Sequence, residues 1–583
     1  RYGPAVTRRR PALLDMLALG AIAVWAGAIL LAARDHVTLS IPGVENDFGV
    51  FVRRSAQLAG RLPVSGAYDP TTDGVLRADG FYNLGYPLLL WLARPLTNDN
   101  PFLAAQLIAA LSGALLLGAA WWLARKMLGR GAALLTLLIL ALSPLVVEYG
   151  LYLGSDMPFA ALCTLALALL LMLHTESRES RTGASQLSIV SSPPQQPGDQ
   201  RQLLAVSTKQ IALVISAGLV AGAAFLVRHP GLLLLPLGWL AIWISLRPQP
   251  SVHNPRSSPP RTRSLLLFTV AFLIAIAPQL LVNIRDTGQL LYSQHAKNIW
   301  LCVYGSCDWG RWDEAPNNVT LSDIVLRDPG RFLASWWANV RGFFGTGGED
   351  TSEFGRAIQL RLLGFPANWL ALGGLLAWTI AIFRRPTSAQ AMRIMLLLWV
   401  GAYVLAVCVG IALPRFFLPL APVYALAAAW TISRLEPRSE SREPGRADEQ
   451  RSENKPNATQ QGSRFRSHAL DFTFYVLRNA SLIAAMLLLV CLWGGFAIGA
   501  GYVLGNQPTD EAAAVQLIQA TVRPGEYVVV RAPPRVALDT ASAIAHLVVP
   551  ENGRYLLSSE GSPPPGSTVV GNAGKYTLYR IVP

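Results

Sequence analysis

Eleven apolar stretches are the feature that most constrains how this chain can fold. Most have roughly the 17 to 25 residues that a helix needs to cross the ~30 Å hydrocarbon core of a bilayer. Of the 583 residues, 52% are hydrophobic and only 14% are charged, which is unlike a soluble domain. The sequence therefore predicts an all-α polytopic membrane protein with about eleven transmembrane helices. The stretches cover about residues 12–33, 101–124, 131–147, 157–173, 211–227, 231–246, 264–282, 362–383, 394–413, 416–432 and 480–504.

The positions of the basic residues predict how the spans are oriented. Arg8, Arg9 and Arg10 precede the first span, and Arg125 and Lys126 lie in the turn after the second. Cytoplasmic loops carry an excess of Lys and Arg, so the N-terminus is expected inside the cell. We expect the first span to be retained, because no small-residue cleavage site follows it. This rule also accounts for the net charge of +14, so we expect membrane lipids and no nucleic acid as partners.

The pattern divides the chain into four expected parts. Residues 1–433 form a transmembrane catalytic module with a first outer loop at 34–100 and a long outer loop at 283–361. Residues 434–470 are poor in large apolar side chains and are expected to be a disordered cytoplasmic loop. Residues 471–506 hold the last transmembrane helix. Residues 507–583 are expected to form a small extracytoplasmic α/β domain, with a helix at 511–521 and strands at 527–531 and 576–581.

The first outer loop carries the main candidate for catalysis. Asp47 forms an acidic cluster with Glu45, two residues earlier, and directly precedes an amphipathic run that begins at Phe48 and is typical of a helix on the membrane surface. A carboxylate at the lipid boundary can serve as a general base. Asp47 can equally be the N-cap of the following helix, and the two roles are compatible. A second short apolar segment, LGYPLLLWLARPL, is too short to cross and is expected to be interfacial or re-entrant.

Further charged residues fall at span ends on the same expected outer face. They are Glu148, Asp156, Arg228, His229 and Arg415. Carboxylates can accept a proton or hold a divalent metal, so Glu45, Asp47 and Asp156 are candidate ligands if a metal is used. Arg and His can bind the phosphate of a lipid-linked donor. Each can also be an ordinary interface anchor, with Arg415 beside Pro414 and His229 in a turn before Pro230.

The long outer loop contains five tryptophans and two cysteines that leave alternatives open. Its tryptophans can stack on sugar rings or belong to the interfacial belt of any membrane protein. Cys302 and Cys307 can form a local disulfide on an oxidising face or remain free thiols. The remaining cysteines, Cys163, Cys408 and Cys491, are expected to be small buried hydrophobes within spans. The tryptophans are Trp300, Trp309, Trp312, Trp336 and Trp337.

Five motifs, in their order along the chain, carry a resemblance to a known family. They are an acidic ND before a surface helix, NLGYPLLLWL, YLGSDMPFAALCTLAL, LVRHPGLLLLPL and LPRFFLPLAPVYALAAAW. This order resembles the GT-C superfamily of membrane glycosyltransferases, in the protein mannosyltransferase and aminoarabinose transferase branch (family 39 and its bacterial relatives). The resemblance covers the first ten spans. The family often has two adjacent acids, whereas Asn46 separates Glu45 from Asp47 here.

The resemblance implies a function and residue roles. Such enzymes take sugars from polyprenyl-phosphate donors, so Asp47 is expected to be the catalytic carboxylate. Asp156 matches the acid that ends the second outer loop, and Arg228 and Arg415 match positions near the donor phosphate.

We therefore expect an inverting glycosyltransferase of the cell membrane whose active site faces the extracytoplasmic side. Its acceptor would be a lipid, a glycan or a protein. A transporter or flippase of lipid-linked glycans is the alternative, although transporters tend to place their polar groups at the bilayer midplane. A scaffold subunit of an envelope complex would tolerate change at Asp47.

Overall fold

The computed structural model describes most of the chain. It covers residues 9–33, 47–59, 76–97, 101–187, 197–246, 261–344, 362–384, 390–434, 483–497, 500–501, 509–522, 528–531, 555–558 and 565–581. Glu45 and the expected cytoplasmic loop beyond Arg434 lie outside these residues, and the side chain of Asp47 is not described.

Within the described residues, seven helices are long and apolar enough to cross a membrane. This number makes the chain a multi-pass membrane protein. The seven are α1 (Arg9–Ala33), α4 (Pro101–Leu128), α7 (Asp156–Leu187), α8 (Pro197–Val227), α10 (Arg261–Thr287), α15 (Ala367–Arg384) and the continuous unit of η5 (Pro414–Leu420) with α17 (Ala421–Ser433).

The other four expected spans also coincide with helices. The third is a pair, α5 (Arg130–Ala141) and α6 (Pro144–Leu151), bent by 56°. Ser143 caps α6 by accepting from the Val146 amide, and Pro144 cannot continue a helix from before it, so the sequence Ser-Pro sets the bend. Shorter apolar helices stand at the remaining three positions: η2 (His229–Leu233) with α9 (Leu234–Ser245), α16 (Ala391–Val407) and the helix Ile483–Ala497. That all eleven cross the bilayer stays a prediction.

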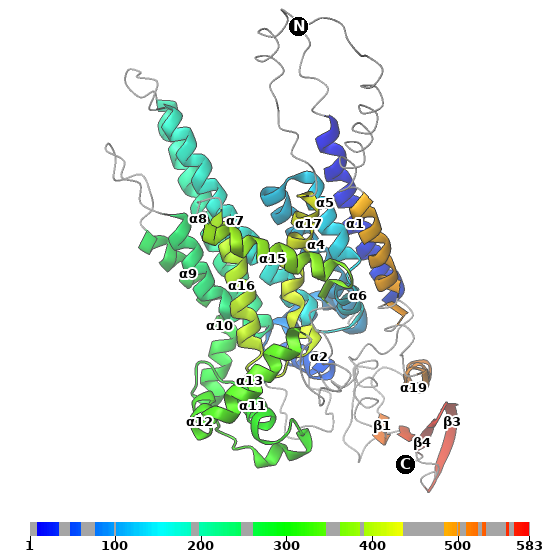
Figure 1. Cartoon of the computed structure of the whole chain (residues 1–583). Helices are drawn as coiled ribbons and strands as arrows, with labels where there is room; N and C mark the ends of the chain where they lie inside the picture. The colour runs from blue at the N-terminus through cyan, green and yellow to red at the C-terminus, as the bar shows by residue number, and fades with distance from the viewer. Residues whose placement is uncertain are drawn as a thin grey trace, which may run out of the picture.

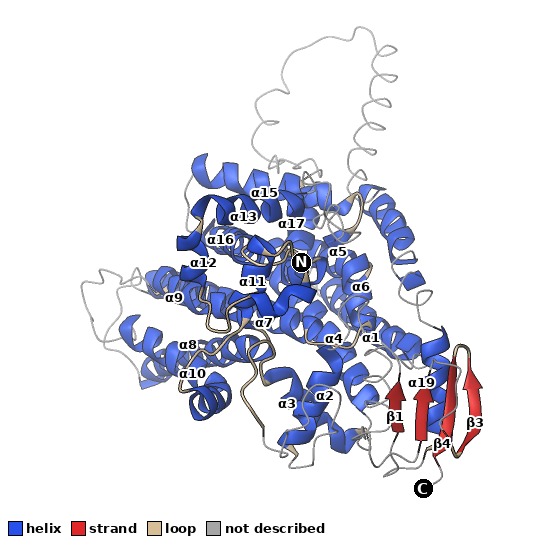
Figure 2. Cartoon of the chain, turned by 90° about the horizontal axis from the view of Figure 1, so that it is seen from below, coloured by secondary structure: helices blue, strands red, loops and turns tan. Residues whose placement is uncertain are grey.

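Small residues allow the membrane helices to pack closely. A Cβ atom at Gly218 would lie 2.4 Å from the Phe268 carbonyl oxygen, and one at Gly222 would lie 2.6 Å from that of Phe272. These two glycines therefore bring α8 against α10, as small residues do at helix interfaces in membranes. Helix α17 is buried along nearly its whole length and lies between α15 and α5 (Figure 2).

The helices of the two expected outer loops gather at one end of the bundle, the lower end in Figure 1. The first loop contributes α2 (Asp47–Leu58), α3 (Gly85–Ala93) and η1 (Arg94–Leu96), so both of its expected short helices are present. The long loop contributes α11 (His295–Tyr304), η3 (Trp309–Glu314), α12 (Leu321–Arg327) and α13 (Pro329–Phe344). At the other end, Asp15 of α1 forms ion pairs with Arg125 at 3.1 Å and Arg130 at 3.6 Å.

The C-terminal residues form a small α/β unit, with α19 beside the strands in Figure 2, and it lies at the same end as α2 in Figure 1. Helix α19 (Thr509–Thr521) packs through Ala514 and Ile518 on a four-stranded sheet with strand order β1-β2-β4-β3. Strands β1 and β2 are parallel, and the other pairs are antiparallel. The expected helix and the expected strands near 527–531 and 576–581 are present, whereas β2 and β3 had no sequence prediction. The strands are β1 (Val528–Arg531), β2 (Tyr555–Ser558), β3 (Ser567–Ala573) and β4 (Tyr576–Ile581).

The cysteines resolve one open alternative and correct one expectation. Cys302 and Cys307 form a disulfide at the end of α11. Cys163 and Cys408 are buried as expected, but Cys491 is exposed on its helix. That helix packs on the core through Leu488 and Leu492, so Cys491 faces away from the protein. An apolar span predicts only that a side chain avoids water, which a lipid-facing position also satisfies.

Candidate active site

Asp156 and Arg228 form an ion pair at the end of the bundle where the helices of the two expected outer loops gather. Asp156 is the first residue of α7, where a carboxylate is favoured by the partial positive charge of the helix N-terminus. Arg228 follows α8, and its Nη1 donates to Oδ1 of Asp156. Only 6% of the Asp156 side chain and 20% of the Arg228 side chain are exposed. The pair therefore joins the start of α7 to the end of α8 in a nearly buried position.

Phe416 joins Arg228 to Arg415. The Arg228 guanidinium carbon lies 5.0 Å from the centre of the Phe416 ring, and that of Arg415 lies 4.9 Å from it. Both distances fall within the range of cation–π contacts. The Tyr403 hydroxyl donates to the Phe416 carbonyl oxygen at 2.8 Å, which fixes the backbone at this point. Two guanidinium groups thus share one ring, and Arg228 also contacts the carboxylate of Asp156.

A pair of histidines extends this cluster toward the long loop. His295 Nε2 lies 3.2 Å from His229 Nδ1, and their ring centres are 4.7 Å apart. Burial, and to a lesser extent the positive charge of Arg228, lower the pKa of His295 to about 4, against raising effects from the Phe81 backbone and Asp79. His295 is therefore neutral at pH 7 and adds no charge to the cluster.

Helix α2 packs close to the loop segment that leads into Asp156. Phe48 and Phe51 are buried in one cluster with Tyr86, Leu90 and Leu153. Leu153 is three residues before Asp156, and Phe48 directly follows Asp47. The backbone of Asp47, at the start of α2, is therefore held in the neighbourhood of the charged cluster.

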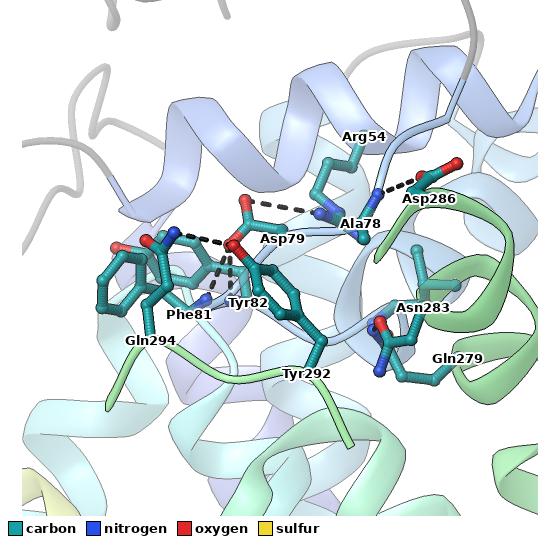
Figure 3. Close-up of polar contacts among 11 residues, drawn as sticks. Arg54, Ala78, Asp79, Phe81, Tyr82, Gln279, Asn283, Asp286, Tyr292 and Gln294 are labelled. Carbon is teal, nitrogen blue, oxygen red and sulfur yellow. Dashed lines mark hydrogen bonds and ion pairs between the residues drawn. The ribbon is translucent and has the colours of Figure 1, made fainter. Parts of the chain in front are cut away.

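Residues 76–84 form a strap that connects the first outer loop to the membrane helices (Figure 3). The Ala78 amide donates to Asp286 of α10 at 2.6 Å, and the Gln294 amide donates to the Gly80 carbonyl at 2.9 Å. The Asn83 side chain donates to the Phe225 carbonyl of α8 at 2.6 Å. The strap is thus tied to three separate elements.

A close backbone approach places α3 against the end of α8. A Cβ atom at Gly85 would lie 2.5 Å from the carbonyl carbon and oxygen of Leu226. Only glycine permits this contact, which lies two residues before Arg228. The sequence NLGYP therefore contributes to the position of Arg228 through its glycine.

Some of the long-loop aromatics lie near this region and others do not. The Trp312 ring centre is 5.4 Å from that of Phe81, and Nζ of the buried Lys297 lies 4.4 Å from the Trp312 ring.

The other tryptophans of the long loop lie elsewhere or are not described. Trp300 is buried against Tyr304. The side chain of Trp309 is not described. Trp336 donates to the Leu405 carbonyl at 3.0 Å, and Trp337 is 53% exposed.

Solved structures with the same arrangement of helices are known. ArnT from Cupriavidus metallidurans, bound to undecaprenyl phosphate, aligns over 98% of both chains with 16% identity and a TM-score of 0.52. The same protein in its apo state gives 15% identity over the same shares and a TM-score of 0.52. The Archaeoglobus fulgidus oligosaccharyltransferase in complex with Zn and sulfate aligns over 92% of this chain and 67% of its own, with 13% identity and a TM-score of 0.50.

The sequence comparisons are more limited. The family model described as dolichyl-phosphate-mannose-protein mannosyltransferase matches residues 84–187, which include α3, α4 and Asp156. No curated protein matches the sequence. The chain has the same fold as ArnT, the GT-C fold.

Within this GT-C fold, four of the six candidate residues come together. Asp156, Arg228, His229 and Arg415 form one cluster from α7, the end of α8, η2 and η5. The side chains of Asp47 and Glu45 are not among those that the structure describes, so these two residues are not assigned to the cluster. The expected roles of all six remain predictions. Glu148, also expected at this face, is buried on α6.

Sequence reasoning missed several residues of this candidate site. Phe416 stands next to Arg415 in the motif LPRFFLPL, but a phenylalanine in an apolar span gives no signal of its own. His295 is a single histidine in a long loop and meets His229 only through the tertiary fold. Arg54 and Asp79, which form an ion pair at 3.3 Å, are ordinary charges in sequence. Arg54 is seven residues after Asp47, so helical spacing offered a weak indication that they share a face.

The described residues do not assemble a metal centre on their own. No group of three or more His, Cys, Asp or Glu side chains suited to hold a metal occurs among the parts of the chain that the structure describes. Asp156 is engaged by Arg228, a cation, which disfavours a second cation there. A metal site that includes Glu45 and Asp47 lies beyond the described side chains.

Proposed function

We propose that the chain is a glycosyltransferase that moves a sugar from a polyprenyl-phosphate donor to an acceptor on the extracytoplasmic face of the membrane. The observation that carries the proposal is the convergence of Arg228 and Arg415 on Phe416 at the outer end of a GT-C fold. Undecaprenyl phosphate is bound by ArnT, which has the same fold. A phosphate with a long lipid tail is the ligand that this position and charge suit best.

The electrostatics of the cluster favour an anion. The guanidinium groups of Arg228 and Arg415 lie on one ring in a nearly buried place, and His295 in the same region is neutral. Guanidinium groups can bind a phosphate through two parallel hydrogen bonds. As the glycosidic bond breaks, negative charge grows on the leaving phosphate, so fixed cations stabilise the transition state more than the bound donor.

Asp47 would complete the reaction as the general base. Its carboxylate takes the proton of the acceptor hydroxyl, and the acceptor oxygen then attacks the anomeric carbon. The bond between that carbon and the phosphate oxygen breaks, and polyprenyl phosphate leaves on the opposite side with its electron pair. One displacement of this kind inverts the anomeric centre. The acceptor is a lipid, a glycan or a protein.

The role of Asp156 follows from its contact with Arg228. A carboxylate that accepts from a guanidinium is a poor proton acceptor, because the ion pair favours its charged form. Asp156 would therefore accept a hydrogen bond from one nitrogen of Arg228 and orient the rest of the guanidinium toward the phosphate. This positioning role fits the contact of Asp156 with Arg228 better than the role of a catalytic base does.

Two features support an extracytoplasmic site. The short helices of both outer loops gather at the end opposite to the pairing of Asp15 with Arg125 and Arg130. The disulfide of Cys302 with Cys307 lies at the same end as the cluster, and disulfides persist in oxidising compartments.

The test is a transfer assay with the purified chain in lipid vesicles. Polyprenyl-phosphate donors carrying a radiolabelled sugar are supplied together with a membrane extract as the source of acceptor. We expect label to leave the donor and free polyprenyl phosphate to appear in equal amounts. Movement of intact donor across the vesicle membrane without cleavage would instead support a flippase and contradict the proposal.

A further inference from the structure

Arg54 is a buried cation on the same helix as Asp47. Helix α2 has 12 residues, and seven residues are close to two helical turns, so Asp47 and Arg54 lie on one face of it. Only 4% of the Arg54 side chain is exposed, and its Nη1 lies 3.3 Å from Oδ2 of Asp79. A buried arginine on an interfacial helix needs a structural reason, because taking it out of water is costly.

The carboxylate of Asp79 is itself held in place. Its Oδ1 accepts from the Phe81 amide at 2.8 Å and from the Tyr82 amide at 3.0 Å, while its Oδ2 faces Arg54 (Figure 3). One oxygen therefore shapes the turn of the strap, and the other contacts α2. Because the strap is fixed to α8, α10 and the start of α11, Asp79 is a rigid reference point for α2.

Apolar packing alone would leave α2 less well defined. Phe51 meets Tyr82 and Tyr86 edge to face, at ring distances of 5.2 and 4.9 Å. Such ring contacts tolerate small rotations and shifts of a helix, whereas a charge pair in a buried position fixes one geometry. A buried ion pair adds little net stability, and in some proteins it is retained because it fixes one geometry.

The same turn of the strap contacts the donor side of the cluster. The Phe81 ring centre lies 5.6 Å from that of His295, and His295 contacts His229, which follows Arg228. A chain of direct contacts therefore runs from α2 through Asp79 and Phe81 to the residues beside Arg228.

We propose that Arg54 and Asp79 are positioning residues that hold Asp47 at a fixed distance from the phosphate-binding arginines. The inference rests on the proposed glycosyl transfer. Its consequence is that the pair acts on the chemical step: a shift of the base by about 1 Å can slow a reaction by about a hundredfold without weakening substrate binding.

The test is a double-mutant cycle with Asp79→Asn and Arg54→Met. The amide of Asn can still accept from the Phe81 and Tyr82 amides, and Met keeps an unbranched apolar stem like that of Arg, so both changes remove mainly the charge pair. We expect each single variant to lower kcat about ten- to a hundredfold with KM for the donor changed less than about threefold. The double variant should be no slower than the slower single variant. Arg54→Lys should recover part of the rate.

Asp15→Asn and Arg125→Met provide a matched control. They remove an ion pair of 3.1 Å at the opposite end of the bundle, and kcat should stay within about twofold of the wild type. A second readout does not need activity: amide hydrogen exchange across residues 48–58 should be faster in Asp79→Asn and Arg54→Met than in the wild type, with α10 unchanged.

Two results would overturn the inference. In the first, the fold-losses in kcat of the two single variants multiply in the double variant. In the second, amide hydrogen exchange in α2 is the same in the variants as in the wild type. If the wild-type chain transfers no sugar, the proposed function fails, and the exchange measurement alone then decides whether the pair positions α2.

Discussion

Arg415 is the residue at which charge and geometry can be separated most cleanly. A lysine keeps the charge but offers neither the two-pronged donor nor the flat face that lies over Phe416. We expect Arg415→Lys to lower the turnover rate clearly and Arg415→Ala to raise the barrier by about 2 to 4 kcal/mol, as loss of a fixed anion contact does. Steady-state transfer rates measure both.

A matched control is Arg393→Lys, because Arg393 also lies over an aromatic ring, that of Trp430 at 5.5 Å, but between the expected eighth and ninth spans on the cytoplasmic side. Its rate should equal that of the wild type. Arg228→Ala should resemble Arg415→Ala but be less severe, since His229 is adjacent. If both arginines tolerate Ala with donor affinity and turnover unchanged, the phosphate is bound elsewhere.

The lowered pKa of His295 predicts how the stability of the fold depends on pH. Its pKa of about 4 in the folded chain lies below the ordinary value of 6.5, so the unfolded chain binds the proton more readily. The free energy of unfolding is then unaffected above pH 6.5 and falls as the pH drops from about 6.5 to about 4. At about 1.4 kcal/mol per pKa unit, the full loss is about 3 kcal/mol.

Thermal unfolding in detergent between pH 4 and 7 measures this effect, with His295→Gln for comparison. The melting temperature of the wild type should fall more steeply below pH 6.5 than that of the variant. Parallel curves would show that the histidine does not resist protonation in the fold.

At the scale of elements, the approach of α3 to α8 is set by one glycine. Gly85→Ala would put a methyl group 2.5 Å from the Leu226 backbone, which cannot yield as a side chain can, so α3 must move away from the residues before Arg228. We expect a loss of about 1 to 3 kcal/mol in stability, as overpacking causes, together with slower transfer.

Gly342→Ala on α13 is the comparison for this change. A Cβ atom at Gly342 would meet nothing within 4 Å, and alanine favours a helix. Its melting temperature should equal or exceed that of the wild type. A Gly85→Ala variant that melts and transfers sugar like Gly342→Ala would contradict the packing argument.

The elements also show what the sequence alone could predict. Helices of the membrane module were predictable because a long apolar stretch in lipid has almost no alternative to a helix. The short strands β2 and β3 were not, because four to seven residues with weak alternation carry little signal. Asp156, Arg228 and Arg415 were found from their places at span ends. Their shared partner Phe416 and the Arg54 and Asp79 pair depend on contacts between distant segments, which spacing does not encode.

At the scale of the whole molecule, the distribution of Arg and Lys among the loops predicts the orientation in the membrane. Starting from a variant without native cysteines, Asn318→Cys and Gly566→Cys should react with an impermeant thiol reagent added to intact cells. Lys126→Cys and Ser452→Cys should react only after the cells are opened. Labelling of Ser452→Cys in intact cells would contradict the eleven-span arrangement.

The central claim is that Asp47 catalyses sugar transfer from a polyprenyl phosphate, and its replacement by asparagine tests this claim most directly. Asn keeps the shape and capping ability of Asp but cannot accept a proton at neutral pH. The measurement is the single-turnover rate of transfer from a radiolabelled polyprenyl-phosphate sugar, together with donor affinity and melting temperature. We predict a rate about 10² to 10⁴ times lower in Asp47→Asn, with affinity and melting temperature unchanged and a smaller loss in Glu45→Gln. A wild-type rate in Asp47→Asn would contradict the account.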